Sequence, residues 1–264
     1  MRRTTVVPLI LALIAFAAWP AAAQQTDDFT WRGRLAPGKR LEVKGVNGDV
    51  RAVAATGGEV VVTAAKHARR SDPDDVKIEV IEHEGGVTIC AVYPTPRRAR
   101  RENVCEPGDH WSSSTENNDV TVDFEVQVPT GVEFTGRTVN GEMRAEGLKA
   151  DVSASTVNGS VRVSTTGIAE ASTVNGSVYV EMGRADWTGE LDFSTVNGGL
   201  TLTLPAQLNT EVHASTVNGE IHTDYPLTIS GRFGPRRVRG TIGTGGRTLS
   251  LSTVNGEIRL KKST

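Results

Sequence analysis

Apolar and polar residues alternate with a period of two on both sides of short turns that contain asparagine and glycine. This period is typical of β-strands that bury one face. Between residues 152 and 163, apolar side chains stand at alternate positions before and after Asn158-Gly159. Asparagine and glycine tolerate the positive φ angles of tight turns. The pattern therefore predicts a strand, a turn and a second strand.

This unit recurs along the chain. Thr-Val-Asn-Gly occurs six times, and a related Gly-Val-Asn-Gly begins at residue 45. Successive asparagines of the six full copies are 18, 17, 22, 21 and 37 residues apart. We expect one strand–turn–strand unit per copy. The predicted turn residues are Asn140, Gly141, Asn158, Gly159, Asn175, Gly176, Asn197, Gly198, Asn218, Gly219, Asn255 and Gly256.

Two all-β architectures fit such units. In an antiparallel meander with one hairpin per repeat, equivalent turns lie about 10 Å apart and barely touch. In a parallel β-solenoid, which resembles a single-stranded β-helix, they lie about 4.8 Å apart. Stacked asparagines then form a hydrogen-bonded ladder, as they do in cross-β assemblies. The identity of the turns favours the solenoid.

The N-terminal half is less regular. Strands are expected at residues 29–35, 40–46, 59–63, 76–81, 87–92 and 120–128, with a loop at 94–118. A hinge at 129–131 divides an irregular β region (24–130) from the repeat solenoid (131–264), although 24–264 as one continuous domain is the alternative. The gap between Asn218 and Asn255 fits a degenerate coil or a projecting loop, and Lys261 and Lys262 suit the cap of a terminal coil.

The first 23 residues have the features of a signal peptide. A basic start is followed by an apolar run at 6–18 and by three alanines at 21–23. An uncleaved anchor is the alternative, but the run is shorter than the ~20 residues of a membrane span. We therefore expect export to the periplasm or cell surface, or secretion, and no membrane span in the mature chain.

The chain contains two cysteines, Cys90 and Cys105. In an oxidising compartment, an even number of cysteines predicts a disulfide. The alternative is two unpaired, buried thiols.

The Ser-Thr-Val-Asn-Gly repeats, together with Leu41-Glu42-Val43 before the first Asn-Gly and Gly240-Thr241-Ile242-Gly243 before the last, resemble the DUF4097 family. The resemblance runs from about residue 29 to 261. It implies a bacterial, exported, β-solenoid-like domain, for which adhesin is a label rather than a mechanism. The family supplies no catalytic motif to carry over.

The chemistry-bearing residues favour binding over catalysis. A net charge of −2 does not predict nucleic-acid binding. His213 and His222 lie beside carboxylates, but a solvated polar face explains them better than a metal site. The carboxylate row of Glu142, Glu220 and Glu257 is interrupted by Ser160, Ser177 and Gly199. We therefore expect no catalytic residue, cofactor or metal; the alternative is a carbohydrate-active β-helix enzyme that acts on an acidic polysaccharide.

Arginine-rich segments supply candidate contacts for phosphate or carboxylate groups. The expected partner is a macromolecule of the envelope or extracellular surface, such as an anionic glycan, or copies of the chain itself. Separate solvated loops are the alternative. An outward column of Arg144, Arg162, Tyr179, Thr201, His222 and Arg259 would allow multivalent contact. The candidate anion contacts are Arg97, Arg98, Arg100, Arg101, Arg232, Arg236, Arg237 and Arg239.

Overall fold

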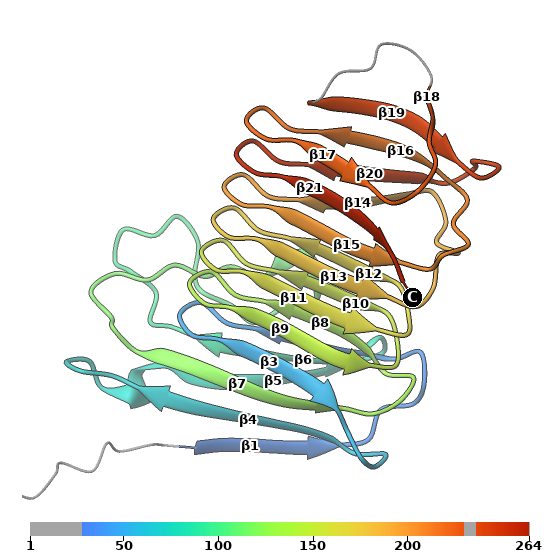
Figure 1. The fold of residues 1–264 in the computed structure, drawn as a ribbon. Helices are drawn as coiled ribbons and strands as arrows, with labels where there is room; N and C mark the ends of the chain where they lie inside the picture. The colour runs from blue at the N-terminus through green and yellow to red at the C-terminus, as the bar shows by residue number, and fades with distance from the viewer. Residues whose placement is uncertain (1–27, 230–235, 264) are drawn as a thin grey trace, which may run out of the picture.

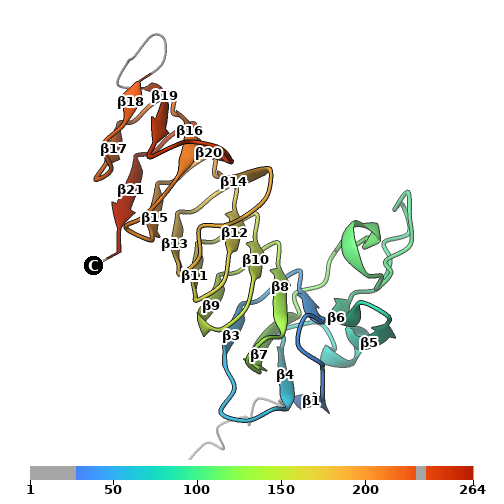
Figure 2. The same cartoon turned by 90° about the vertical axis from the view of Figure 1, so that its right-hand side faces the viewer.

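The computed structural model describes residues 28–229 and 236–263, which form two facing β-sheets and two short 3-10 helices, η1 (Pro73–Asp75) and η2 (Gly108–His110) (Figures 1 and 2). Sheet A has the strand order β1 (Asp28–Gly33), β4 (Val60–His67), β7 (Thr121–Val128), β3 (Val50–Ala54), β9 (Met143–Leu148), β11 (Val161–Thr165), β13 (Val178–Met182), β15 (Leu200–Leu204), β21 (Ile258–Lys262), β17 (Ile221–Thr223). Sheet B has the order β18 (Thr228–Ile229), β19 (Arg237–Ile242), β16 (Thr210–Ser215), β20 (Thr248–Ser252), β14 (Glu190–Ser194), β12 (Ala169–Ser172), β10 (Val152–Ser155), β8 (Glu133–Arg137), β2 (Arg40–Lys44), β6 (Gly86–Val92), β5 (Lys77–His83).

Each repeat contributes one strand to sheet B, one Asn-Gly turn and one strand to sheet A. Equivalent strands pair in parallel: β11 pairs with both β9 and β13, and β10 pairs with both β8 and β12. The parallel pairing confirms the solenoid and excludes the meander. Within the described residues no helix is both long and apolar enough to cross a membrane. The predicted signal peptide, 1–23, lies outside them.

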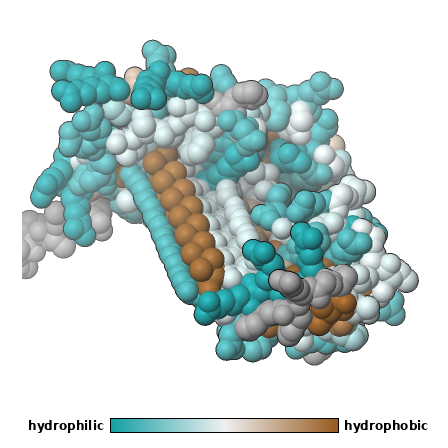
Figure 3. All heavy atoms as spheres, turned by 90° about the horizontal axis from the view of Figure 1, so that it is seen from above, coloured by the Kyte–Doolittle hydropathy of each residue, from teal (hydrophilic) through white to brown (hydrophobic). Residues whose placement is uncertain are grey.

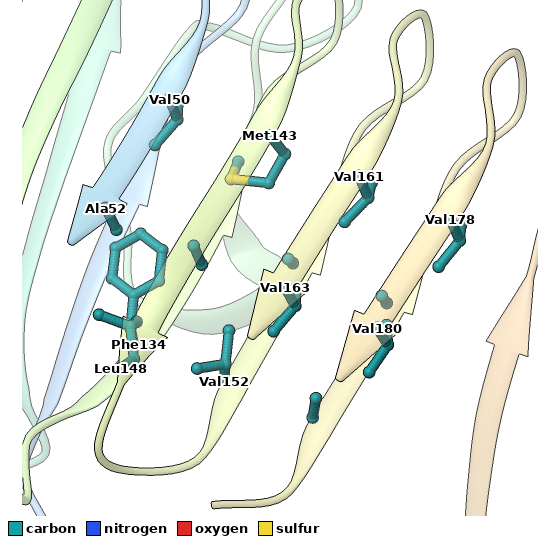
Figure 4. Packing of buried hydrophobic residues seen from close by; sticks show 14 of the residues in the cluster. Val50, Ala52, Phe134, Met143, Leu148, Val152, Val161, Val163, Val178 and Val180 are labelled. Atoms are coloured by element: carbon teal, nitrogen blue, oxygen red, sulfur yellow. The ribbon is translucent and has the colours of Figure 1, made fainter. Parts of the chain in front are cut away.

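The core is a narrow layer of aliphatic side chains between the two sheets. Val161 and Val178 of sheet A are completely buried, and Val152 and Ala154 of sheet B face them with at most 4% exposed (Figure 4). Alternation in each strand places these residues inward and their neighbours outward. The register matches inward positions from coil to coil, with one shift between β9 and β11 after Val163, so the core is continuous along the stack.

Three residues of each turn hold neighbouring coils together. The buried hydroxyl of Thr173 donates to the carbonyl of Gly159 in the preceding coil at 2.8 Å. The amide Nδ2 of Asn175 donates to Oδ1 of Asn158 at 2.8 Å, as one rung of a ladder from Asn47 to Asn218. A Cβ atom on Gly176 would lie 2.0 Å from the Gly159 oxygen, so only glycine permits this close approach.

The order of coils in space differs from their order in the sequence. The asparagine bridges run from Asn197 to Asn255 and then back to Asn218. The coil made by β20 and β21 therefore lies between the coil of β14 and β15 and the coil of β16 and β17 (Figure 1). The other end has the same arrangement, because β3 lies between β7 and β9 and β2 lies between β6 and β8. Both sheets consequently run without a break across residues 129–131.

Antiparallel strands lie at both ends of the stack. β19 pairs with β16 and β18 with β19, while β4 pairs with β7 and β5 with β6. The long gap before Asn255 thus contains an antiparallel cap rather than a coil or a simple loop. Lys261 and Lys262 belong to β21 inside sheet A, so the expectation that they cap a terminal coil was wrong.

All six strands expected in the N-terminal half occur; β3 was missed.

The loop at 93–119 extends outward from sheet B beside β5 and β6 (Figure 2). A disulfide joins Cys90 of β6 to Cys105 of the loop, as the sequence predicted. The fully buried Lys44 ammonium donates to the carbonyls of Glu106 and Gly108 at 2.6 and 2.7 Å and lies 3.1 Å from Glu42. Burial lowers the pKa of Lys44. A covalent bond and a fully paired buried charge therefore fix this loop.

Candidate functional site: the outer face of sheet A

Three arginines are stacked on the outer face of sheet A. Each lies three residues after a turn glycine, and the register places Arg51 beside Arg144 and Arg144 beside Arg162. All three side chains are exposed. Neighbouring strands are about 4.8 Å apart, so the guanidinium groups form a row of positive charges along the solenoid. We call Arg51, Arg144, Arg162 and the adjoining Tyr179 the arginine column.

The members of this column have different neighbours. Arg144 donates to the Glu142 carboxylate, and this hydrogen bond raises the pKa of its guanidinium. Arg162 lies 4.3 Å from the centre of the Tyr179 ring, within the range of a cation–π contact. Among the described residues, no carboxylate lies within ion-pair distance of Arg51 or Arg162. These two arginines are therefore the cations best placed to meet an external anion.

A shallow groove of about 330 Å³ runs across this face beside the column. Tyr179, which is 38% exposed, and Arg162 form part of its lining. The other outward side chains that line the groove are carboxylates and hydroxyls: Glu146, Glu181, Ser164, Thr201 and Thr203. An aromatic ring, a guanidinium and several hydrogen-bonding oxygens are together suited to a polar ring compound such as a sugar.

At the far end of the same face the charges neutralise one another. His222 Nε2 lies 3.2 Å from Glu220 and 3.0 Å from Glu257, and Arg259 Nε lies 2.7 Å from Glu257. The hydrogen bond from Arg259 lowers the pKa of Glu257. This cluster exists because the β20–β21 coil lies next to the β16–β17 coil. It offers less net positive charge than the arginine column.

The two histidines considered for metal binding lie in different sheets. His213 lies on β16 in sheet B, whereas His222 lies on β17 in sheet A. Within the described ranges, no three His, Cys, Asp or Glu side chains have an arrangement that would hold a metal ion. The Glu142, Glu220 and Glu257 row is still interrupted, although the coil order makes Glu257 and Glu220 neighbours.

The arginine-rich segments lie at opposite ends of sheet B. Arg97, Arg98, Arg100 and Arg101 are exposed in the disulfide-linked loop near β6. Arg236, Arg237 and Arg239 are exposed in or next to β19, eight strand positions away from β6 in sheet B. Arg232 lies outside the described residues. Each segment therefore stands alone, and neither adjoins the arginine column.

The sequence analysis identified most of this column but missed Arg51. Arg144, Arg162 and Tyr179 were expected to share an outward column, and the register places them together. Arg51 follows Gly48 by three residues, as Arg144 follows Gly141. That spacing was the available signal, but the sequence separation of 93 positions between Arg51 and Arg144 concealed their adjacency.

A comparison with solved structures finds distant matches. They include a "putative cell adhesion protein" of Clostridium sporogenes, at 10% identity over 90% of this chain and 100% of that one, with a TM-score of 0.49. A "putative adhesin" of Bacteroides fragilis has 10% identity over 89% of this chain and 97% of that one, with a TM-score of 0.34. These similarities are too remote to bear on function. None of the proteins with curated descriptions matches the chain. The Toastrack DUF4097 family model matches residues 39–261, and the chain therefore belongs to that family.

Proposed function

We propose that this protein is an exported, non-enzymatic adhesin that binds an acidic polysaccharide along the outer face of sheet A. The observation that carries the proposal is the arginine column, in which Arg51 and Arg162 have no carboxylate partner among the described residues. The periplasm or cell surface is the proposed location, on the basis of the signal-peptide features of residues 1–23.

The column suits a linear anionic polymer better than a small ion. Its cations repeat at one strand spacing along a rigid sheet, so a chain with a charged group on successive units can meet several of them at once. Planar guanidinium groups form bidentate contacts with carboxylate or sulfate groups. Tyr179 presents an aromatic face next to Arg162, on which the apolar face of a sugar ring can pack. Each contact is weak because it is exposed, and the affinity comes from their number.

The test compares two sets of arginines of nearly equal charge. Arg51, Arg144 and Arg162 are replaced by Gln in one variant, and Arg97, Arg98, Arg100 and Arg101 in the other. Binding to polygalacturonate and to uncharged dextran is measured by calorimetry at two salt concentrations. We expect the column variant to lose about tenfold or more in affinity for polygalacturonate, the loop variant to match the wild type, and salt to weaken binding.

Two results would count against this function. Loss of binding in the loop variant with retention in the column variant would move the anion site to the disulfide-linked loop. Shortening of the polymer during incubation would favour the alternative of a carbohydrate-active enzyme.

A further inference from the structure

The turn edge of the solenoid carries an apolar stripe that the fold does not explain. Threonine, asparagine and glycine of each Thr-Val-Asn-Gly turn make the contacts between coils described above. In five of the six turns the valine side chain instead points outward, whereas Val139 of the first turn packs against the core. Exposure is 37–39% at Val157, Val174, Val196 and Val254, and 55% at Val217. Figure 3 shows the result as a continuous apolar stripe beside a hydrophilic one. We call these five valines the valine ridge.

The ridge is flat, regular and uncharged. The asparagine ladder runs along one side of it, and the Ser-Thr-Val-Asn-Gly turns that carry it contain no charged residue. The bridges between successive asparagines place the valines at one strand spacing, about 4.8 Å. Stacking on neighbouring coils already covers more than half of most of these side chains, and the remaining methyl groups face solvent. Contiguous exposed apolar surface of this kind is a feature of interaction sites.

We propose that the valine ridge is a self-association surface, on which a second copy of this chain packs ridge against ridge. A partner with the same 4.8 Å repeat can contact every valine, and identical stacked side chains form dry, interdigitated interfaces in this way. Two copies also meet here without like charges, whereas two arginine columns would repel each other. The ridge has no aromatic or basic residue, which distinguishes it from the surfaces that enter membranes.

The size of the ridge sets the strength of this association. From Val157 to Val217 it spans four strand spacings, or roughly 20 Å, and it is about one side chain wide. Such a strip buries far less than the ~800 Å² per partner of a stable interface. The dimer is therefore weak in solution and becomes significant where many copies are held together. This inference does not depend on glycan binding.

Sedimentation velocity from about 10 μM to 1 mM tests the proposal. One variant carries Val157→Thr, Val174→Thr, Val196→Thr and Val254→Thr, which keep the β-branched shape and remove apolar surface. The matched control is Val53→Thr, at a partly buried position on the outer face of sheet A. We expect the wild type and the control to dimerise alike and the ridge variant to dimerise at least about tenfold more weakly.

A cross-linking measurement gives an independent readout. A cysteine introduced by Val174→Cys should form intermolecular disulfides faster than one introduced by Tyr179→Cys on the outer face of sheet A. The proposal is overturned if the wild type stays monomeric up to 1 mM, if the ridge variant dimerises as well as the wild type, or if the two cysteines cross-link at equal rates. Wild-type monomers that bind lipid vesicles through the ridge would assign it to a membrane instead.

Discussion

The central coils and the two ends of this solenoid are stabilised in different ways. Between β10 and β15 each coil lies between two nearly identical neighbours, and the same threonine, asparagine and glycine contacts recur at every step. The ends lack a second identical neighbour. They use antiparallel strands, a disulfide, the buried Lys44 and two buried tyrosines. Repetition therefore fixes the register, while features unique to each end determine where the stack stops.

Deletion of residues 247–264 should have the largest effect. In a solenoid stacked in sequence order, loss of the last coil removes one interface; here it removes a layer between β14–β15 and β16–β17. The buried side chains of Leu249, Leu251, Ile258 and Leu260 are lost. At ~1.5–3 kcal/mol each they amount to roughly 6–12 kcal/mol, which is comparable with the whole stability of a domain. Thermal unfolding followed by circular dichroism should show a lower melting temperature and a smaller cooperative transition than in the full chain. An unchanged melting temperature would contradict the inserted position of this coil.

Alkaline pH should weaken the ends before the centre. Burial raises the pKa of Tyr93, near the N-terminal end, and of Tyr225, near the other end, to about 12. Their hydroxyls donate to the carbonyls of Val120 and Leu204, both at 2.8 Å. The unfolded phenol loses its proton near pH 10, so the contribution of Tyr93 is intact below pH 10. It falls by about 1.4 kcal/mol per pH unit between pH 10 and 12.

Urea unfolding at pH 9, 10 and 11 measures this effect. Tyr93→Phe should reduce the loss of stability above pH 10, and Tyr179→Phe, at an exposed position, should leave it unchanged. The same pH dependence in all three proteins would show that these tyrosines do not control it.

The asparagine ladder allows centre and end to be compared with one substitution. Asn175 both donates and accepts a ladder hydrogen bond, whereas Asn218 only donates one, to Asn255. Each such bond contributes about 0.5–1.5 kcal/mol. Asn175→Ala should therefore cost about twice as much stability as Asn218→Ala in urea unfolding. Equal costs would mean that the ladder contributes nothing beyond the backbone bonds.

Spontaneous deamidation should distinguish the terminal turn at Asn218 from the central turns. Of the changes considered, it should have the smallest effect on stability. In this reaction the backbone nitrogen of the following glycine attacks the asparagine Cγ, ammonia leaves, and water opens the cyclic imide to aspartate or isoaspartate. The N–H of Gly176 donates to the Asn197 carbonyl at 3.0 Å, and the other inner turns have the same bond. Among the described residues, none accepts from the N–H of Gly219. Peptide mass spectrometry after incubation at pH 8.5 should find Asn218 modified first. Equal rates at Asn218 and Asn175 would contradict this protection.

The repeats themselves could be predicted from sequence, but their order in space could not. Alternation around Asn158-Gly159 indicated two strands and a turn, and the identity of the turns indicated parallel stacking. Every coil presents the same faces to its neighbours, so no local pattern shows that Asn255 lies between Asn197 and Asn218. The same limitation hid Arg51 from the arginine column. The antiparallel pairing of β19 was equally hidden, because alternation in Val238 and Ile242 fits either direction.

The β20–β21 coil lies between coils that precede it in the sequence. Folding therefore cannot be completed until this late-synthesised segment is available. The β14 and β16 coils emerge first and carry the same turn residues, yet in the native protein they must remain one layer apart. We therefore expect a direct pairing of β14 with β16 to act as a kinetic trap until the β20–β21 coil inserts between them. The long sequence separation of its contacts slows this step. A second molecule carries an identical β20–β21 coil. We therefore expect exchange of this coil between two chains as the misassembly during refolding at high concentration.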